Sequence, residues 1–494
     1  MIYMADLVQF IDSKIEKNPV FLLGNEAIAR GAVEAGIEFA SSYPGTPSSE
    51  VGETLSHVAD KLGIKFLYSV NEKVALESAF AASISGMRSL VFMKHVGLNV
   101  ASDPFVSIVY TGTRGGLVIM TADDPSMFSS QNEQDNRHYA DLAHIPMIEP
   151  SNPQEAKDFV KAAFELSEKY HIPVLFRTTT RVSHMRGPVN VGEIPKIKGT
   201  RRVFERDPER FVSLPVNAIG LKKMLMEKLG EIAVESDMSF MNKAQSNMVS
   251  EIGAITSGSG YNSLMDAVAS HSIEIDVLKI GFTNPLPRGM IAEFLRKHDK
   301  VVIVEELDPY MEEKIRAIAQ INGIRTRIYG KLDGYFPLVY ELNPDAVLQS
   351  LARILNMPGY IQGKSPKTGV DLPPRPPVLC PGCPHRGTYY VVKRSVRMSN
   401  IKNPIYASDI GCYSLGTYDP FDEADTLISM GSSIGVANGF SMVTDQKVIA
   451  FIGDSPFLRS FLSRIMAHSL LEMITETPVW FNDLFIVAKD SLRL

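Results

Sequence analysis

Residues 447–457, KVIAFIGDSPF, decide the fold of this 494-residue chain. The apolar run at 448–452 is rich in β-branched residues and predicts a buried strand of a parallel sheet. Gly453, Asp454 and Ser455 then end the strand abruptly. Ligands of α/β proteins bind beyond the carboxyl ends of such strands, and a carboxylate at that place suits Mg²⁺. The plainer interpretation is a strand-ending turn with Asp454 as a helix N-cap.

The spacing to a downstream asparagine favours the metal interpretation. Thiamine diphosphate enzymes share a Gly-Asp-Gly sequence followed by an asparagine, and both polar side chains bind the Mg²⁺ of the diphosphate. Here Asn482 follows Asp454 at the end of the apolar stretch 478–481, and Ser455 replaces the third glycine. The pair Asp454 and Asn482 therefore resembles that motif, with one departure.

The composition is that of an ordinary soluble globular protein, with 45% hydrophobic and 21% charged residues. A net charge of −6 gives no electrostatic attraction to nucleic acid or anionic lipid. The sequence shows neither an apolar run long enough for a membrane span nor the pattern of a signal peptide. Three cysteines do not make a disulfide framework, so we expect a cytoplasmic protein.

Three blocks follow one another along the chain. Residues 1–195 alternate strand and helix signals, which is typical of a doubly wound parallel α/β domain. Residues 196–370 begin with a charged, irregular stretch and continue with predicted strands at 252–256, 273–280 and 300–306. The Pro-rich linker 371–377, DLPPRPP, marks the boundary between this block and the third, residues 371–494. The predicted fold class is α/β, with several parallel-sheet domains.

Glu72 follows a short predicted strand and begins a helix rich in small residues, among them Ala75, Ala79 and Ala81. A glutamate in the first turn of a helix is favourable with the helix dipole whatever its function. The functional alternative is a carboxyl group beside the aminopyrimidine of thiamine diphosphate. There it would hold the ring in its imino tautomer and support proton exchange.

Two polar loops follow strands of the first block. Residues 43–49, YPGTPSS, form either a turn that caps the next helix or a rigid loop that presents Thr46 to a substrate carboxylate. Residues 129–138, SSQNEQDNRH, form either a solvated loop or one wall of an active site, because amide, acidic and basic side chains are crowded there.

The cysteines are Cys380, Cys383 and Cys412, and the first two form a CxxC pair. CxxC suits metal or cluster ligation, or a redox pair. A [4Fe–4S] cluster takes four ligands, so three cysteines are one too few unless His385 supplies the fourth. That ligand count favours buried structural thiols in a tight turn.

Seven motifs lie in order along the chain: 43–49 (YPGTPSS), 71–77 (NEKVALE), 96–99 (VGLN), 130–137 (SQNEQDNR), 380–386 (CPGCPHR), 409–412 (DIGC) and 453–455 (GDS). Together they resemble the alpha subunit of indolepyruvate ferredoxin oxidoreductase, one of the 2-oxoacid:ferredoxin oxidoreductases. The resemblance implies oxidative decarboxylation of aryl pyruvates such as indolepyruvate to aryl-acetyl-CoA. Coenzyme A would be the acyl acceptor and ferredoxin the electron acceptor.

The resemblance also implies a thiamine diphosphate-binding fold. Residues 1–195 would be the pyrimidine-binding domain, 196–370 a transketolase C-terminal-like domain with linker, and 371–494 the diphosphate-binding domain. After Phe457 the sequence loses the family pattern, and it lacks the ferredoxin-like tail that carries [4Fe–4S] clusters in the family. We therefore expect the third domain to be truncated.

Carried over residue by residue, the resemblance assigns roles to individual positions. Glu72 would be the catalytic acid. Substrate would be bound by Thr46, Asn99 and Arg137. The cofactor would be held by Glu72, Gly411, Cys412, Gly431, Ser432, Gly453, Asp454, Ser455 and Asn482. Mg²⁺ would be ligated by Asp454 and Asn482, and an iron–sulfur group, if bound, by Cys380, Cys383 and Cys412.

The partners implied are a beta subunit in a hetero-oligomer, ferredoxin, coenzyme A and a 2-oxoacid, without nucleic acid or membrane. Two other functions stay open on the sequence. The missing ferredoxin-like tail favours a non-redox thiamine-dependent 2-oxoacid decarboxylase. The altered sequence after Phe457 favours a catalytically incomplete scaffold subunit.

Overall fold

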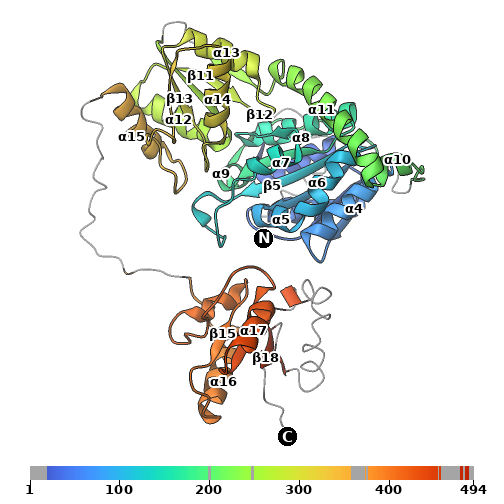
Figure 1. Ribbon diagram of the computed structural model, residues 1–494, viewed down its shortest axis with the longest axis vertical. Coiled ribbons are helices and arrows are strands. Elements are labelled where there is room, and N and C mark those ends of the chain that lie inside the picture. Colours follow the sequence, from blue (N-terminus) through green and yellow to red (C-terminus); the bar gives the residue numbers. More distant parts are fainter. Residues whose placement is uncertain are drawn as a thin grey trace. The chain divides into compact units, whose positions relative to one another are not determined.

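The computed structural model describes residues 19–197, 202–245, 250–357, 373, 377–453, 456–457, 479–481 and 484–488. The chain divides into two compact units, Met1–Gly363 and Lys364–Leu494. Figure 1 labels the elements of both units. Among the helices of these described ranges, none has the length and apolar character that a bilayer span requires.

The first unit is built on a seven-stranded sheet with the order β12-β6-β7-β5-β4-β2-β3. Neighbouring strands from β6 to β3 are parallel, and β12 at one edge is antiparallel to β6. The strands are β2 (Phe39–Ser42), β3 (Lys65–Tyr68), β4 (Ser89–Lys94), β5 (Leu117–Asp123), β6 (Met147–Ile148), β7 (Val174–Thr179) and β12 (Phe282–Asn284). The predicted doubly wound α/β architecture is confirmed.

Helices connect these strands and pack on the sheet (Figure 1). They are α2 (Gly24–Glu34), α3 (Ser49–Leu62), α4 (Glu72–Ile84), α5 (His95–Val100), α6 (Ser102–Thr111), η1 (Pro125–Met127), α7 (Arg137–Ala143), α8 (Pro153–Tyr170) and α9 (Thr180–His184). A separate two-stranded antiparallel sheet pairs β1 (Val20–Leu23) with β8 (Arg186–Val189).

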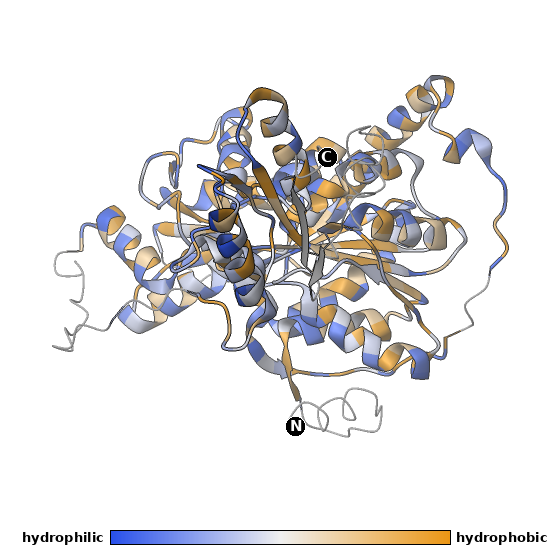
Figure 2. Cartoon of the chain, turned by 90° about the horizontal axis from the view of Figure 1, so that it is seen from below, coloured by the Kyte–Doolittle hydropathy of each residue, from blue (hydrophilic) through white to orange (hydrophobic). Residues whose placement is uncertain are grey.

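The central strands show why the apolar runs predict this sheet. Every residue of β5 and β7 is buried, as expected for parallel strands covered on both faces. In Figure 2 the strands are mainly orange, whereas the helices around them carry both orange and blue. α2 is followed by Gly36 with φ +73°, the left-handed position that ends a helix.

A second sheet in the same unit has the order β14-β13-β10-β11-β9, with β9 antiparallel to its neighbour. Its strands are β9 (Lys243–Gln245), β10 (Ile252–Ser257), β11 (Asp276–Ile280), β13 (Lys300–Val304) and β14 (Arg327–Tyr329). The helices of this region are α10 (Pro208–Phe211), α11 (Pro215–Asp237), α12 (Gly258–His271), α13 (Arg288–Lys297), α14 (Tyr310–Ile321) and α15 (Pro344–Leu355). β12 belongs to this region of the sequence, but it pairs with β6 in the first sheet.

The second unit contains a four-stranded sheet, β15-β16-β18-β17. Its elements are α16 (Pro384–Met398), β15 (Ile405–Ala407), η2 (Cys412–Thr417), α17 (Ser432–Val443), β16 (Val448–Gly453), β17 (Val479–Phe481) and β18 (Leu484–Ala488). All of β16 is buried and β15 runs parallel to it, as predicted. β18 instead runs antiparallel to β16, so this sheet is mixed. β17 and β18 are too close in sequence to pair in parallel.

Candidate active site

The first sheet reverses its winding direction between β2 and β4. From β2 the chain proceeds to β3 on one side, then returns to β4 on the other side and continues to β5. Such a switch point opens a crevice at the carboxyl ends of the two strands, where α/β proteins bind ligands. Here the loop at 43–48 follows β2 and Lys94 ends β4, so this crevice is the candidate active site.

Glu72 is the first residue of α4 and is buried, with 4% of its surface exposed. Asn71 caps the helix, because its Oδ1 accepts a hydrogen bond of 2.9 Å from the Val74 N–H. Gly97 of α5 lies directly against the Glu72 side chain. A Cβ at position 97 would lie 2.7 Å from Glu72 Cγ and 2.8 Å from Oε1. Only glycine leaves the carboxyl group its present position.

Lys94 brings a cation to the same crevice. Its Nζ donates a hydrogen bond of 3.0 Å to the Ser129 carbonyl, and its methylene stem packs on Gly45. Burial lowers the pKa of Lys94, while the carboxylates of Asp124 and Glu72 act in the opposite direction. The sequence analysis missed this lysine, because a lysine after an apolar run is also typical of a solvated strand end.

Thr46 lies beside Lys94, in the loop after β2, and is exposed. Its carbonyl accepts a hydrogen bond of 3.5 Å from Ser129 Oγ. The loop is held from below by Asn25, whose Nδ2 donates to the Pro47 carbonyl at 2.7 Å. Thr46 and Lys94 thus share Ser129 as a hydrogen-bond partner.

Asp124 fixes the polar loop that follows β5. Its Oδ2 accepts hydrogen bonds from Ser129 N at 2.8 Å and Ser130 Oγ at 2.7 Å, and its Oδ1 accepts from Thr180 Oγ1 at 2.7 Å. Burial acts to raise the pKa of Asp124, but these hydrogen bonds outweigh it and the pKa is lowered. The loop that the sequence predicts as an active-site wall is therefore anchored on an ionised carboxylate.

Asn99 is exposed one helical turn after His95. Its Nδ2 donates a hydrogen bond of 2.7 Å to Gln134 Oε1, and its Oδ1 accepts one from the Tyr139 hydroxyl. His95 is fully buried, donates from Nε2 to the Asn132 carbonyl at 3.1 Å, and has a pKa lowered by burial. These side chains join α5 to the polar loop, so Asn99 faces the loop that would form the wall.

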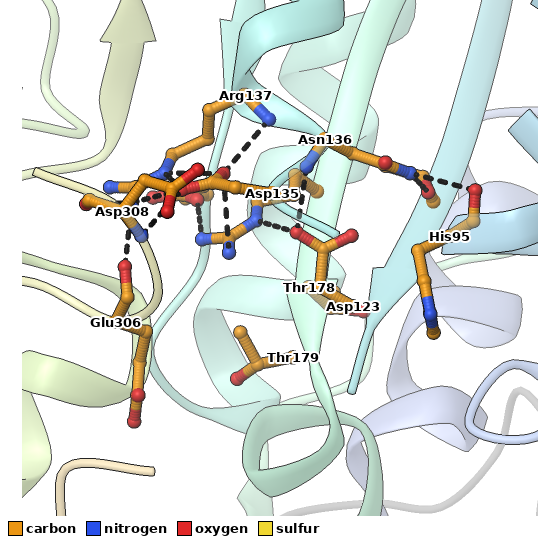
Figure 3. Close-up of polar contacts among 12 residues, drawn as sticks. His95, Asp123, Asp135, Asn136, Arg137, Thr178, Thr179, Glu306 and Asp308 are labelled. Atoms are coloured by element: carbon orange, nitrogen blue, oxygen red, sulfur yellow. Dashed lines mark hydrogen bonds and ion pairs between the residues drawn. The ribbon is translucent and has the colours of Figure 1, made fainter. Parts of the chain in front are cut away.

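Arg137 is completely buried in an ion-pair cluster (Figure 3). Its Nε donates to Asp135 Oδ1 at 2.8 Å, and its Nη1 donates to Glu305 Oε2 at 2.6 Å. Its Nη2 also donates to the carbonyl of Glu306 at 2.6 Å. These contacts tie the loop after β5 to the end of β13. Arg137 could bind a substrate, the role that the resemblance implies, only if one of these hydrogen bonds were broken.

Arg177, a residue of β7, extends the same cluster. Its Nε donates to Asp123 Oδ2 at 2.8 Å, and its Nη1 pairs with Glu149. Burial raises the pKa of Asp123 to about 7 despite Arg177. Burial also disfavours ionisation of Asp135, but the charge of Arg137 outweighs it and holds the pKa of Asp135 below its usual range. The cluster is a buried support for the loops above it.

In the second unit, those predicted cofactor residues that the structure describes gather at one edge of the sheet. Asp409 follows β15, and its carboxylate accepts hydrogen bonds from the N–H groups of Gly431 at 2.6 Å and Ser433 at 3.0 Å. Gly431 has φ +82°, a left-handed conformation that favours glycine. Asp409, which sequence reasoning had given no role, thereby holds Ser432 and the N-terminus of α17 beside β15. Burial raises the pKa of Asp409 against these hydrogen bonds.

The ring of Tyr413 lies against Gly411 and Gly453, the other two glycines of this edge that were predicted to bind the cofactor. A Cβ on Gly411 would lie 2.4 Å from Tyr413 Cε1, and one on Gly453 would lie 2.9 Å from the same atom. Gly411, the exposed Cys412 and Gly453 therefore lie around one tyrosine ring, at the carboxyl ends of two parallel strands.

Comparisons with known proteins agree with this arrangement. Residues 30–256 match the family described as pyruvate flavodoxin/ferredoxin oxidoreductase, thiamine diphosphate-binding. The indolepyruvate oxidoreductase subunit IorA of Methanothermobacter marburgensis is 50% identical over 445 residues, which are 89% of this chain and 71% of that protein. The IorA of Archaeoglobus fulgidus is 45% identical over 458 residues, 90% of this chain and 72% of that protein. The chain belongs to the IorA family.

The fold of this IorA-family chain is similar to that of a solved 2-oxoglutarate:ferredoxin oxidoreductase from Magnetococcus marinus. The TM-score is 0.55 at 15% sequence identity, over 69% of this chain and 65% of that chain. The likeness supports a thiamine diphosphate-binding fold. The chain is a subunit of an oxidoreductase of the 2-oxoacid:ferredoxin class.

The described residues of the IorA-family chain fit thiamine diphosphate. Gly431 has a left-handed φ that favours glycine, and the twelve-residue helix α17 directs its N-terminus to the same edge. In the first unit, the buried carboxyl group of Glu72 suits the aminopyrimidine. Asp454, Ser455 and Asn482, the predicted Mg²⁺ and diphosphate residues, lie outside the described residues.

The cysteines are free, with Cys380 and Cys412 exposed and Cys383 half-buried. Cys380 and Cys383 lie on a tight turn before α16, in which Cys383 N–H donates to the Cys380 carbonyl at 3.1 Å. Across the residues that the structure describes, the one group of His, Cys, Asp or Glu ligands close enough for a metal is Asp135, His138 and Asp308. The tight turn is present, but Cys380 is exposed and Cys383 only half-buried, so the expectation of buried thiols is wrong. Iron ligation by these cysteines stays a prediction.

Proposed function

We propose that this IorA-family chain binds thiamine diphosphate and Mg²⁺ and decarboxylates aryl pyruvates, indolepyruvate among them, on the way to aryl-acetyl-CoA. The names of its relatives support the substrate, because the matched IorA proteins are called indolepyruvate oxidoreductase subunits. Coenzyme A takes the acyl group, and ferredoxin takes the electrons one at a time. A beta subunit completes the enzyme.

The observation that carries the proposal is the crevice at the switch point. Glu72, a buried carboxyl group, and Lys94, a cation, lie on neighbouring elements there, with Gly97 making room for the first. The carboxylate of a 2-oxoacid must be held in place until it is released as CO₂. The crevice supplies an acid for the cofactor and a cation for the substrate.

Within this crevice each side chain has one task. Thiamine diphosphate supplies an electron sink when it is bound. Glu72 holds a proton at its carboxyl group, ready for exchange with the aminopyrimidine nitrogen. Lys94 Nζ and Thr46 Oγ1 bind and orient the substrate carboxylate. Asp124 keeps Ser129, a hydrogen-bond partner of both, in place.

Residues of the second unit would hold the diphosphate of the cofactor. Gly411, Gly431 and Gly453 would border it, and the N-terminus of α17 at Ser432 would stabilise its negative charge. Asp454 and Asn482 would ligate Mg²⁺. The buried hydrogen bonds of Asp409 support this assignment, because they fix the α17 N-terminus before any ligand arrives.

The test uses the chain together with its beta subunit. Indolepyruvate is supplied with thiamine diphosphate, Mg²⁺ and a one-electron dye, with and without coenzyme A. The proposal predicts dye reduction that requires both thiamine diphosphate and coenzyme A. Release of CO₂ without dye reduction would instead identify a non-redox decarboxylase. A calorimetric titration without heat from thiamine diphosphate would identify a scaffold subunit.

A further inference from the structure

The turn after β5 carries two adjacent apolar side chains at the surface, Met127 and Phe128, which we call the apolar corner. Met127 is 44% exposed and Phe128 is 62% exposed. Met127 ends η1, which follows β5, and β5 runs parallel to its neighbour β4. The apolar corner therefore lies at the same edge of the first sheet as the crevice at the switch point.

The backbone that displays the apolar corner is strained. Ser126 has φ +68° and Met127 has φ +53°, so two consecutive residues with a Cβ adopt the left-handed conformation. That conformation costs free energy in a residue other than glycine, and residues held in it cluster at ligand-binding sites. Single exposed apolar side chains are ordinary on a protein surface. A strained turn that displays two adjacent ones calls for a function.

Hydrogen bonds on both sides hold the apolar corner in this conformation. Before it, the Ser126 N–H donates to Glu133 Oε1 at 2.6 Å. Within it, the Met127 N–H donates to the Asp124 carbonyl at 2.9 Å. After it, the Ser129 N–H donates to Asp124 Oδ2 at 2.8 Å. The backbone of the corner is thus fixed although its side chains are exposed.

The apolar corner adjoins the groups proposed to hold the substrate carboxylate. Ser129, the residue after Phe128, accepts the hydrogen bond of 3.0 Å from Lys94 Nζ at its carbonyl. Its Oγ donates to the Thr46 carbonyl at 3.5 Å. Consecutive Cα atoms are about 3.8 Å apart, so Phe128 lies next to the residue that Lys94 and Thr46 share. In an aryl pyruvate, only the carbonyl carbon and a methylene separate the aromatic ring from the carboxylate.

We propose that the apolar corner binds the aromatic ring of the substrate and selects aryl pyruvates over small aliphatic 2-oxoacids. The inference rests on the proposed function, in which Lys94 Nζ and Thr46 Oγ1 bind the carboxylate. With that end held, the ring lies against Phe128 in an offset or edge-to-face arrangement, and the Met127 thioether contacts the ring edge. A short aliphatic side chain covers little of this apolar surface, so its 2-oxoacid gains little from the corner.

The first test measures binding without turnover. Indole-3-propionate has the ring and the carboxylate of the substrate but no 2-oxo group, so it binds without reacting. In calorimetric titrations of the complex with its beta subunit, Phe128→Ala should weaken this binding at least about tenfold, whereas Phe128→Tyr, which keeps the ring, should not. Phe21→Ala is the matched control, because Phe21 is also 62% exposed but belongs to the separate sheet of β1 and β8.

The second test compares indolepyruvate with 2-oxobutyrate in the dye-reduction assay. Phe128→Ala should lower kcat/KM for indolepyruvate at least about tenfold and that for 2-oxobutyrate less than about twofold, because only the first acid reaches the ring of Phe128. Met127→Gln should shift the ratio of the two values in the same direction, since an amide replaces the thioether.

Three results would overturn the proposal while the proposed function stands. One is a Phe128→Ala complex that binds indole-3-propionate as tightly as the wild type does. Another is an equal loss of activity with both acids. The third is a Phe128→Ala chain that no longer binds the beta subunit, since the apolar corner would then be a subunit contact. The proposed function itself fails if the wild-type complex with thiamine diphosphate turns over neither acid.

Discussion

Gly97→Ala is expected to slow the enzyme without removing any catalytic group. The new methyl carbon would lie 2.7 Å from Glu72 Cγ and 2.8 Å from Oε1, whereas ordinary contacts begin at 3.4 Å. The Glu72 carboxyl group must therefore move by about 0.7 Å or rotate away. A misplacement of about 1 Å can reduce a rate by about 10²-fold, so we expect a fall of about 10- to 10²-fold.

The assay is the initial rate of dye reduction by the complex with indolepyruvate at saturating thiamine diphosphate. Gly439→Ala is the matched control, because Gly439 is also helical and a Cβ there meets nothing within 4 Å. It should keep the wild-type rate. In a Glu72→Gln background, Gly97→Ala should have little further effect, since both changes act on one group. A folded Gly97→Ala enzyme with the wild-type rate would refute the reasoning about Glu72.

Four further predictions concern single side chains. Glu72→Gln should lower the decarboxylation rate at least ~10²-fold, and an unchanged initial rate would remove Glu72 from the mechanism. Lys94→Met should raise the KM for the 2-oxoacid at least about tenfold, more than Lys94→Arg does; equal KM values in steady-state kinetics would contradict this role. Arg137→Met leaves Asp135 and Glu305 buried without their cation, and should lower the free energy of unfolding by about 3–5 kcal/mol in chemical denaturation. Burial raises the pKa of Glu423 to about 8 from its usual 4.5. The native state then keeps a proton that the unfolded state loses, so stability falls as the pH rises between about 4.5 and 8. Urea unfolding at pH 5 and pH 8 should show that Glu423→Gln reduces this fall.

Much of the fold could be predicted because burial leaves a local pattern. β16 is a continuous apolar run, β5 and β7 begin with the apolar runs 117–120 and 174–176, and each strand is fully buried. Membership of β12 in the first sheet could not be predicted, since it depends on the pairing of Phe282 with Ile148 far away in sequence.

The candidate site could be predicted in part. Thr46 and Glu72 follow neighbouring parallel strands, as the apolar runs before them predict, and the rule that ligands bind at such ends is what proposes them for one site. Lys94 could not be recognised, because its partners Ser129 and Asp124 come from a different loop.

The burial of Arg137 could not be foreseen either. Its carboxylate partner Glu305 is 168 residues away, so sequence spacing carries no signal of the ion pair. A polar loop such as 129–138 looks solvated until its anchors, Asp123 and Asp124, are known.

The most direct test of the central claim is an experimental structure of the complex with thiamine diphosphate and Mg²⁺ bound. We predict a Glu72 carboxyl oxygen about 2.6–3.2 Å from a nitrogen of the aminopyrimidine ring, the range of a hydrogen bond that can transfer a proton. A bound cofactor whose aminopyrimidine makes no contact with Glu72 would contradict the account.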